Sequence, residues 1–169
     1  MSSIKVLAQK VTKINAEALV AGFFQDDRPL TGLAAELDWI YNGILSRLIL
    51  RNRIRGEVKE TTLLATQRKL HTQKILMIGL GKRKELTQKI LQDIYSHIGQ
   101  TLSQLHIKDS AVELFGQTGR ASEDFKEVEA ILKSLRTDPD HAMELALLVP
   151  EEEQAQRIRQ RVLHLTGSA

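Results

Sequence analysis

The sequence predicts an α/β domain with three layers, α/β/α, in which helices cover both faces of a central mixed sheet. Short apolar runs typical of buried strands alternate along the chain with longer segments whose apolar residues recur at helical spacing. Two of the strands are separated by a short polar link compatible with a hairpin, which makes the sheet mixed. The 169 residues, 42% of them hydrophobic, suffice for one domain over residues 1–169.

Four strands and one helix are predicted in the first half of the chain. The strands are expected at residues 4–9, 18–24, 61–67 and 74–80. The second of these is a nearly continuous apolar run, which is typical of a strand buried on both faces. After it, apolar residues at helical spacing from Leu33 to Leu48 predict a helix, and Thr31 is placed to cap its N-terminus.

The second half of the chain continues the alternation. Helices are expected at residues 90–105, at 122–135 and from Glu151 onward, with strands at 110–116 and 143–150 between them. Ser122 is placed to cap the second of these helices. The last helix begins with three glutamates and carries arginines further on, a charge pattern that matches the helix dipole.

The composition excludes several classes of protein. With no cysteine, the chain cannot form a disulfide, a thiolate metal site or a cysteine nucleophile. No apolar run approaches the roughly 20 residues that span a bilayer, and the N-terminus lacks the apolar segment of a secretory signal. We therefore expect a cytoplasmic protein without a membrane partner. The formal charge of +3 is a weak indication of phosphate or nucleic-acid partners.

No catalytic constellation is visible in the sequence. The five histidines lack the spacing of a zinc-protease helix, and no serine stands in a Gly-x-Ser-x-Gly elbow. Asp26 and Asp27 are interpreted as loop residues rather than as an acid/base pair. One group of side chains could ligate a metal: Asp138, Asp140, His141 and Glu144. The favoured interpretation is that this segment is a solvated turn before a strand and not a metal site. We predict no catalytic residue, no metal and no cofactor.

The segment from Lys74 to Leu91 contains two glycines one residue apart, three consecutive basic residues and then a helical pattern. It fails the pattern of a Walker-type phosphate loop, and Lys84 stands where a dinucleotide-binding loop has its third glycine. Glycines at a strand end still let backbone N–H groups approach a ligand, and the basic residues add positive potential. The predicted ligand-binding residues are Gly32, Gly79, Gly81 and Lys82. The alternative is a tight turn between a strand and a helix.

Two arginine-rich segments leave nucleic-acid binding open. One contains Arg47, Arg51, Arg53 and Arg55, and the other, in the last helix, contains Arg157, Arg159 and Arg161. Clustered arginines can neutralise phosphates, but aromatic residues make up only 4% of the chain, which leaves little for stacking on single-stranded nucleic acid. A solvated helix face is the favoured interpretation.

Four short motifs in a fixed order point to a family. They are Leu30-Thr31-Gly32, Gly43-Ile44-Leu45-Ser46-Arg47-Leu48, Gly56 with Glu60-Thr61, and Gly79-Leu80-Gly81-Lys82. With this order over residues 30–87, the chain resembles the N-terminal domain of the leucyl (cytosol) aminopeptidases, a family of two-metal exopeptidases. The resemblance implies a fold like that of a macro domain.

The resemblance also carries expectations about function. In this family a larger C-terminal domain holds both metals and the catalytic lysine and arginine, and its Asn-Thr-Asp and Glu-Gly-Arg segments are not found in this sequence. No catalytic or metal residue carries over. The implied function is a non-catalytic accessory or interaction domain, whose partner is a separate aminopeptidase catalytic domain or a second copy of itself. Two alternatives stay open: a macro-like module that binds ADP-ribose or a related nucleotide, and a DNA-binding accessory domain, because some bacterial members bind DNA.

Overall fold

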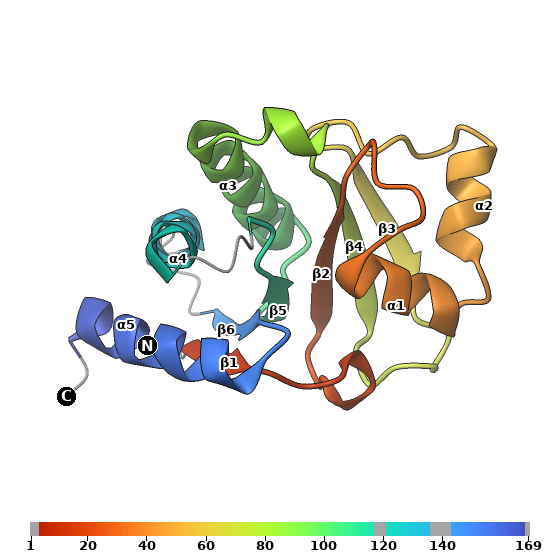
Figure 1. Cartoon of the computed structure of the whole chain (residues 1–169). Coiled ribbons are helices and arrows are strands. Elements are labelled where there is room, and N and C mark those ends of the chain that lie inside the picture. The colour runs from red at the N-terminus through yellow and green to blue at the C-terminus, as the bar shows by residue number, and fades with distance from the viewer. Residues whose placement is uncertain (1–3, 117–120, 136–142, 168–169) are drawn as a thin grey trace. The chain divides into compact units, whose positions relative to one another are not determined.

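The computed structural model describes residues 4–116, 121–135 and 143–167 (Figure 1). The chain groups into two compact units, one from Lys10 to Thr87 and the other made of the chain up to Gln9 together with the chain from Gln88. Each unit combines helices with paired strands, so the predicted α/β class is confirmed. The extent of a single domain over residues 1–169 stays a prediction.

The unit from Lys10 to Thr87 contains three strands. They are β2 (Ala18–Phe23), β3 (Thr61–Ala65) and β4 (Lys74–Gly79). β2 and β4 are parallel, whereas β3 and β4 form the predicted antiparallel hairpin. Strand pairing is therefore mixed, as predicted. β2 is buried along almost its whole length, which its continuous apolar run predicts.

The helical segments of this unit are η1 (Val11–Lys13), α1 (Gly32–Ile40), α2 (Ile44–Leu50) and η2 (Arg83–Glu85). The prediction of one continuous helix from Leu33 to Leu48 is wrong. Asn42 and Gly43 both take left-handed backbone conformations, with φ of 55° and 77°, which end α1 and start α2. The Asp38 carboxylate then accepts hydrogen bonds from the Ser46 N–H (3.1 Å) and hydroxyl (2.5 Å) in the first turn of α2.

The described residues of the other unit form three parallel strands in the order β1, β6, β5. They are β1 (Ile4–Leu7), β5 (Asp109–Glu113) and β6 (Glu144–Leu148), and its helices are α3 (Gln88–Gln104), α4 (Ala121–Leu135) and α5 (Glu152–Thr166). α3 packs against α4, α4 packs against α5, and α5 runs along β1 (Figure 1). None of the helices in the described part of the chain has the length and apolar character to cross a membrane.

The helix starts test the predicted caps. Thr31 does occupy the N-cap position of α1, but its hydroxyl donates to Asp27 (2.8 Å) instead of to the helix backbone. The prediction that Ser122 caps α4 is wrong, because α4 already begins at Ala121. Glu151 is the N-cap residue of α5, so the predicted start of the last helix is confirmed.

Candidate functional site

The candidate site lies in two loops at the carboxyl ends of β2 and β4. Residues 24–31 join β2 to α1, and residues 80–82 join β4 to η2. Because β2 and β4 are parallel, both loops leave the strands at the same edge, where α/β folds commonly bind ligands. The predicted ligand residues lie in or directly beside these loops: Gly32, Gly79, Gly81 and Lys82.

Gly79 ends β4 against the loop of residues 56–60. Its N–H donates to the Glu60 carbonyl oxygen (2.8 Å), and its own carbonyl oxygen accepts from the Lys59 N–H (3.0 Å). A Cβ atom at Gly79 would lie 2.0 Å from the Glu57 carbonyl oxygen. The glycine therefore permits a close approach of two backbone segments, and both of its backbone polar groups have partners within the chain.

Gly81 forms the turn that follows β4. Its φ of 74° is left-handed, which glycine adopts at little cost. The Gly81 N–H donates to the Gly56 carbonyl oxygen (2.8 Å), and the Gly81 carbonyl accepts from the Gln25 N–H (2.8 Å). Since the N–H groups of both Gly79 and Gly81 are used in this way, neither is presented to a ligand in this conformation.

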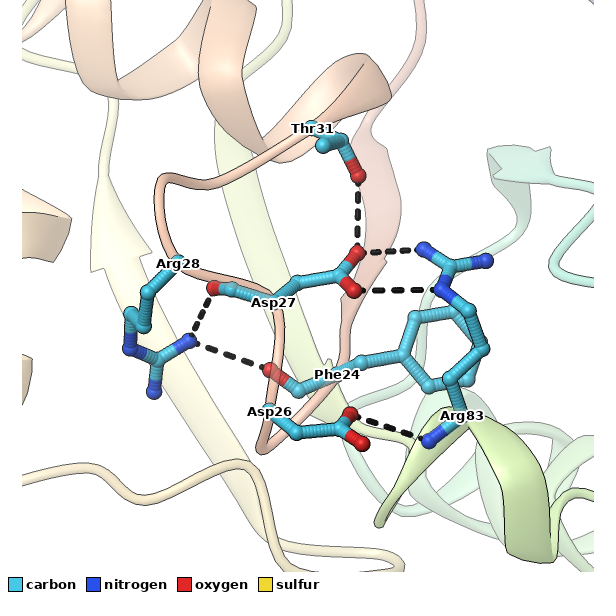
Figure 2. A network of polar contacts seen from close by, with 6 residues as sticks. All are labelled: Phe24, Asp26, Asp27, Arg28, Thr31 and Arg83. Atoms are coloured by element: carbon cyan, nitrogen blue, oxygen red, sulfur yellow. Dashed lines mark hydrogen bonds and ion pairs between the residues drawn. The ribbon is translucent and has the colours of Figure 1, made fainter.

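Figure 2 shows how Arg83 joins the two loops. Its Nε donates to Asp27 Oδ1 (3.1 Å), and its Nη2 makes a shorter contact with Asp27 Oδ2. The Arg83 backbone N–H donates to Asp26 Oδ1 (3.0 Å). The guanidinium carbon lies 4.0 Å from the centre of the Phe24 ring. A bidentate ion pair stacked on an aromatic ring has a well-defined geometry, so Arg83 cross-links the loops specifically.

Asp27 also organises its own loop (Figure 2). Its Oδ2 accepts from the Thr31 hydroxyl (2.8 Å), while Arg28 Nη1 donates to the carbonyl oxygens of Asp27 (2.5 Å) and Phe24 (3.1 Å). The hydrogen bond from Arg83 lowers the pKa of Asp27 and outweighs burial, which acts in the opposite direction. The same hydrogen bond raises the pKa of Arg83. Both groups are therefore charged at neutral pH.

The contacts of Arg83 and Asp27 connect the sequence neighbours of two predicted ligand residues. Gly32 is exposed at the start of α1, with a left-handed φ of 58°. Thr31, its neighbour, is bonded to Asp27, and Asp27 is paired with Arg83, which follows Lys82. These polar contacts thus join Thr31, which precedes Gly32, to Arg83, which follows Lys82.

Two of the three consecutive basic residues after β4 are paired with acids, and the third, Lys84, is exposed. Lys82 Nζ lies 3.6 Å from Glu85 Oε1, and Arg83 is paired with Asp27. A phosphate at this edge would face the two aspartates and compete with Asp27 for Arg83, which Coulomb repulsion opposes. The contacts favour a structural turn, and ligand binding by the four predicted residues stays a prediction.

Sequence reasoning placed Asp26 and Asp27 correctly in a loop but missed their partner. They bond to Arg83 across 57 and 56 positions of sequence. The one sequence signal for this pairing is that two acids follow the apolar run of β2 and basic residues follow the apolar run of β4. It predicts an ion pair only once β2 and β4 are known to be neighbours.

The arginine-rich segments use part of their charge within the chain. Arg55 pairs with Glu57 (Nη1 to Oε1, 3.5 Å). Arg159 donates from Nε (3.1 Å) and Nη2 (2.9 Å) to the Val6 carbonyl oxygen, so it ties α5 to β1. The exposed arginines of these segments include Arg51, Arg53 and Arg157.

No metal centre is assembled in the described part of the chain, since no three histidine, aspartate or glutamate side chains there are grouped to hold an ion. The group considered in the sequence lies mostly outside the described residues, which exclude Asp138, Asp140 and His141. Glu144 is the first residue of β6, and its Oε2 lies 3.9 Å from Lys5 Nζ.

A model of the N-terminal domain of the cytosol aminopeptidase family matches residues 20–137, well over half of the chain. The chain belongs to the cytosol aminopeptidase family. The family expected from the four motifs is therefore confirmed, and the matched part is the N-terminal domain.

Longer proteins contain regions similar to this aminopeptidase N-terminal domain. A probable cytosol aminopeptidase of Haemophilus ducreyi is 30% identical over 103 residues, which cover 59% of this chain and 20% of that protein. A mutant of tomato leucine aminopeptidase superposes with a TM-score of 0.69 at 16% identity, over 99% of this chain and 36% of the tomato chain. The match thus spans about a fifth of the Haemophilus protein.

The fold of this aminopeptidase N-terminal domain is also that of a macro domain. The Oceanobacillus iheyensis macrodomain with ADP superposes with a TM-score of 0.74 at 10% identity, over 97% of this chain and 92% of that one. At this identity the similarity concerns the fold alone. The predicted macro-domain-like architecture is confirmed.

In this aminopeptidase N-terminal domain, motifs that indicated the family contact one another. Gly81 bonds to Gly56 and Gly79 bonds to Glu60, which joins the fourth motif to the third. The Glu60 carboxylate in turn accepts from the Gly56 N–H (2.6 Å), closing the turn between them. The third and fourth motifs therefore determine how two loops pack against each other at the end of β4, which is a structural role.

Proposed function

We propose that this chain is a non-catalytic interaction domain that binds a separate aminopeptidase catalytic domain or a second copy of itself, without a cofactor. The observation that carries the proposal is the internal use of the predicted ligand loops. The N–H groups of Gly79 and Gly81 are bonded within the chain, and Arg83 is paired with Asp27. These contacts occupy the backbone N–H groups and the guanidinium that a ligand at this edge would otherwise bind.

Exposed apolar side chains support an interaction role. Trp39 on α1 is 86% exposed, and Leu50 on α2 is 82% exposed. Aromatic residues are enriched at the centres of protein interfaces, where they lose more water than smaller side chains do. Trp39 is the one tryptophan of the sequence, so its fluorescence reports contact at α1 selectively.

The absence of catalysis is tested with a leucyl chromogenic substrate and added zinc or manganese. The pure chain should give no turnover above a metal-only blank, while an intact leucine aminopeptidase in the same buffer provides the positive control. Turnover that follows the purified chain through gel filtration would overturn the proposal.

Partner binding is tested by titrating the catalytic domain of a family member, prepared without tryptophan, into this chain. Burial of Trp39 should shift its emission to shorter wavelength. Leu50→Ser should weaken binding if α2 contributes, whereas Leu163→Ser, which alters a 54% exposed leucine on α5, is the matched control. Light scattering over a range of concentrations tests self-association. An unchanged emission together with a monomer at every concentration contradicts this function.

Nucleotide binding is the second candidate, favoured by the fold shared with the macrodomain with ADP and by the position of the loops at the ends of parallel strands. Calorimetry with ADP-ribose tests it. Heat that is lost in Lys82→Met and kept in the exposed control Lys89→Met would support this candidate, and no heat at millimolar ligand would remove it.

DNA binding is the third candidate and rests on the exposed arginines Arg51, Arg53 and Arg157. Binding through them should weaken steeply as salt rises, because phosphate contacts release counterions. Fluorescence anisotropy with labelled duplex DNA at two salt concentrations decides the matter, and a salt-independent signal argues against it. For all three candidates we propose a cytoplasmic location, in keeping with the name of the family.

A further inference from the structure

A second polar cluster lies far along the chain from the candidate site and is almost fully buried. It centres on Glu127 of α4, which is 1% exposed. Glu127 Oε1 accepts from the N–H groups of Phe115 (2.5 Å) and Gly116 (3.0 Å), and from the hydroxyl of Tyr95 on α3. One carboxylate oxygen thus holds the residues that follow β5 to both α3 and α4.

The other oxygen of this carboxylate, Glu127 Oε2, is buried and has no hydrogen-bond partner among the described residues. Asp124, one helical turn earlier, repeats the pattern: its Oδ2 accepts from Gln154 Nε2 of α5 (3.0 Å), but its Oδ1 is buried without a partner. An ionised Glu127 would therefore place charge on an unsolvated oxygen close to a second acid. Both features disfavour the ionised form.

Charged and titratable groups from α3, β5 and α5 surround the Glu127 cluster. On α3, burial and then the charge of Glu127 raise the pKa of Tyr95 well above its usual range. β5 supplies Glu113, whose charge acts on Tyr95 in the same direction. α5 supplies Arg161, but this cation is paired with Glu129 on the outer part of α4.

These contacts act on the pKa of Glu127 in opposite directions. Burial raises the pKa of Glu127 to about 7, hydrogen bonds from Tyr95, Gly116 and Phe115 oppose the rise, and the charge of Asp124 adds to it. Glu127 thus changes charge near neutral pH while it holds a junction between a strand and two helices.

We propose that Glu127 is a proton switch at the end of β5: the neutral carboxyl holds Phe115 and Gly116 against α3 and α4, and loss of the proton loosens this junction. The physical reason is that an ionised carboxylate gains hydration when the junction opens, whereas a neutral one gains little. The switch does not depend on the proposed function, because it resides in another part of the chain and involves no partner.

The first test follows the protonation of Glu127 directly in the whole chain. In protein labelled with ¹³C-glutamate, one side-chain carboxyl resonance should titrate near pH 7, and it should be missing in Glu127→Gln. A spectrum in which every glutamate titrates near pH 4.5 would overturn the proposal without any variant.

The second test measures the junction by hydrogen exchange at the Phe115 and Gly116 amides, corrected for the intrinsic pH dependence of exchange. The opening equilibrium should increase with pH, by up to about 300-fold in total, because the folded pKa of about 7 exceeds the usual 4.5. Protection in β4 reports global unfolding and serves as the internal control, because the free energy of opening at Phe115 and Gly116 should lie below that of β4 at every pH. Constant protection at Phe115 and Gly116 while Glu127 titrates would also overturn the switch.

Two substitutions should move the pH midpoint of the Glu127 titration in opposite directions. Tyr95→Phe removes a hydrogen bond that favours the ionised form, so the midpoint should rise. Asp124→Asn removes a neighbouring negative charge, so the midpoint should fall. A merely structural role for the cluster changes stability without opposite shifts in a titration, so shifts in the same direction refute the assignment.

Discussion

Replacement of Gly79 by alanine tests whether this glycine serves a close backbone approach. The φ of Gly79 is not left-handed, so alanine can adopt the backbone conformation and only space is at issue. The added methyl group would lie 2.0 Å from the Glu57 carbonyl oxygen and 2.7 Å from the Gly56 carbonyl carbon, and both are backbone atoms. The loop of residues 56–60 must therefore move away from β4.

The magnitude follows from the contacts that this movement breaks. Ordinary contacts begin at 3.4 Å, so the loop must retreat by about 1.4 Å. Three backbone hydrogen bonds join it to β4 and the following turn: Lys59 to Gly79, Gly79 to Glu60, and Gly81 to Gly56. At about 1 kcal/mol each, their loss costs roughly 3 kcal/mol, of which the better strand propensity of alanine returns about 0.5. For a chain of this size the melting temperature should fall by roughly 5–10 °C.

The assay is thermal and urea unfolding of Gly79→Ala beside Gly43→Ala. Gly43 has a left-handed φ of 77°, but a Cβ there meets only the end of the Arg47 side chain at 3.7 Å. Gly43→Ala should therefore cost only the conformational term, about 1 kcal/mol. If Gly79→Ala is no less stable than Gly43→Ala, the steric reasoning is refuted.

Three other outcomes are expected. Between pH 4 and 8 the free energy of unfolding should fall by roughly 3 kcal/mol, because folding raises the pKa of Glu127 from 4.5 to about 7. Urea titrations at several pH values should show that Glu127→Gln abolishes this fall, whereas Glu36→Gln, at an exposed position, retains it. Arg83→Met should cost about 1 kcal/mol in thermal melts, since its ion pair is half-exposed and screened by solvent. High salt should reduce the difference in stability between the Arg83→Met variant and the unsubstituted chain. Arg159→Met should cost about 1–2 kcal/mol by removing both donors to the Val6 carbonyl, while the exposed Arg157→Met stays within about 0.5.

Periodicity along the chain was enough to predict most of the secondary structure. β2 and the hairpin of β3 and β4 follow from apolar runs of strand length, and α3 follows from apolar residues at helical spacing, because each pattern reflects the repeat of a single element. The break between α1 and α2 was missed although an Asn-Gly pair marks it. Apolar residues keep helical spacing across both α1 and α2, so the pattern is the same as that of one continuous helix.

The candidate site could be located from sequence but not interpreted from it. Paired glycines after an apolar run predicted a tight connection at the end of β4, and the structure has one. Their hydrogen bonds to the loop of residues 56–60 decide between a ligand loop and a structural turn, and no local pattern reports those bonds.

By itself, the sequence determined the α/β class, the approximate bounds of most elements and, through the order of four motifs, the family. Tertiary structure alone decided that Arg83 is bound by Asp27 and that Glu127 is buried with one oxygen unpartnered. The physical reason is the range of the interactions. Periodicity and turn chemistry act between residues a few positions apart, whereas the charge state of a side chain depends on neighbours that strand register and helix packing bring from far along the chain.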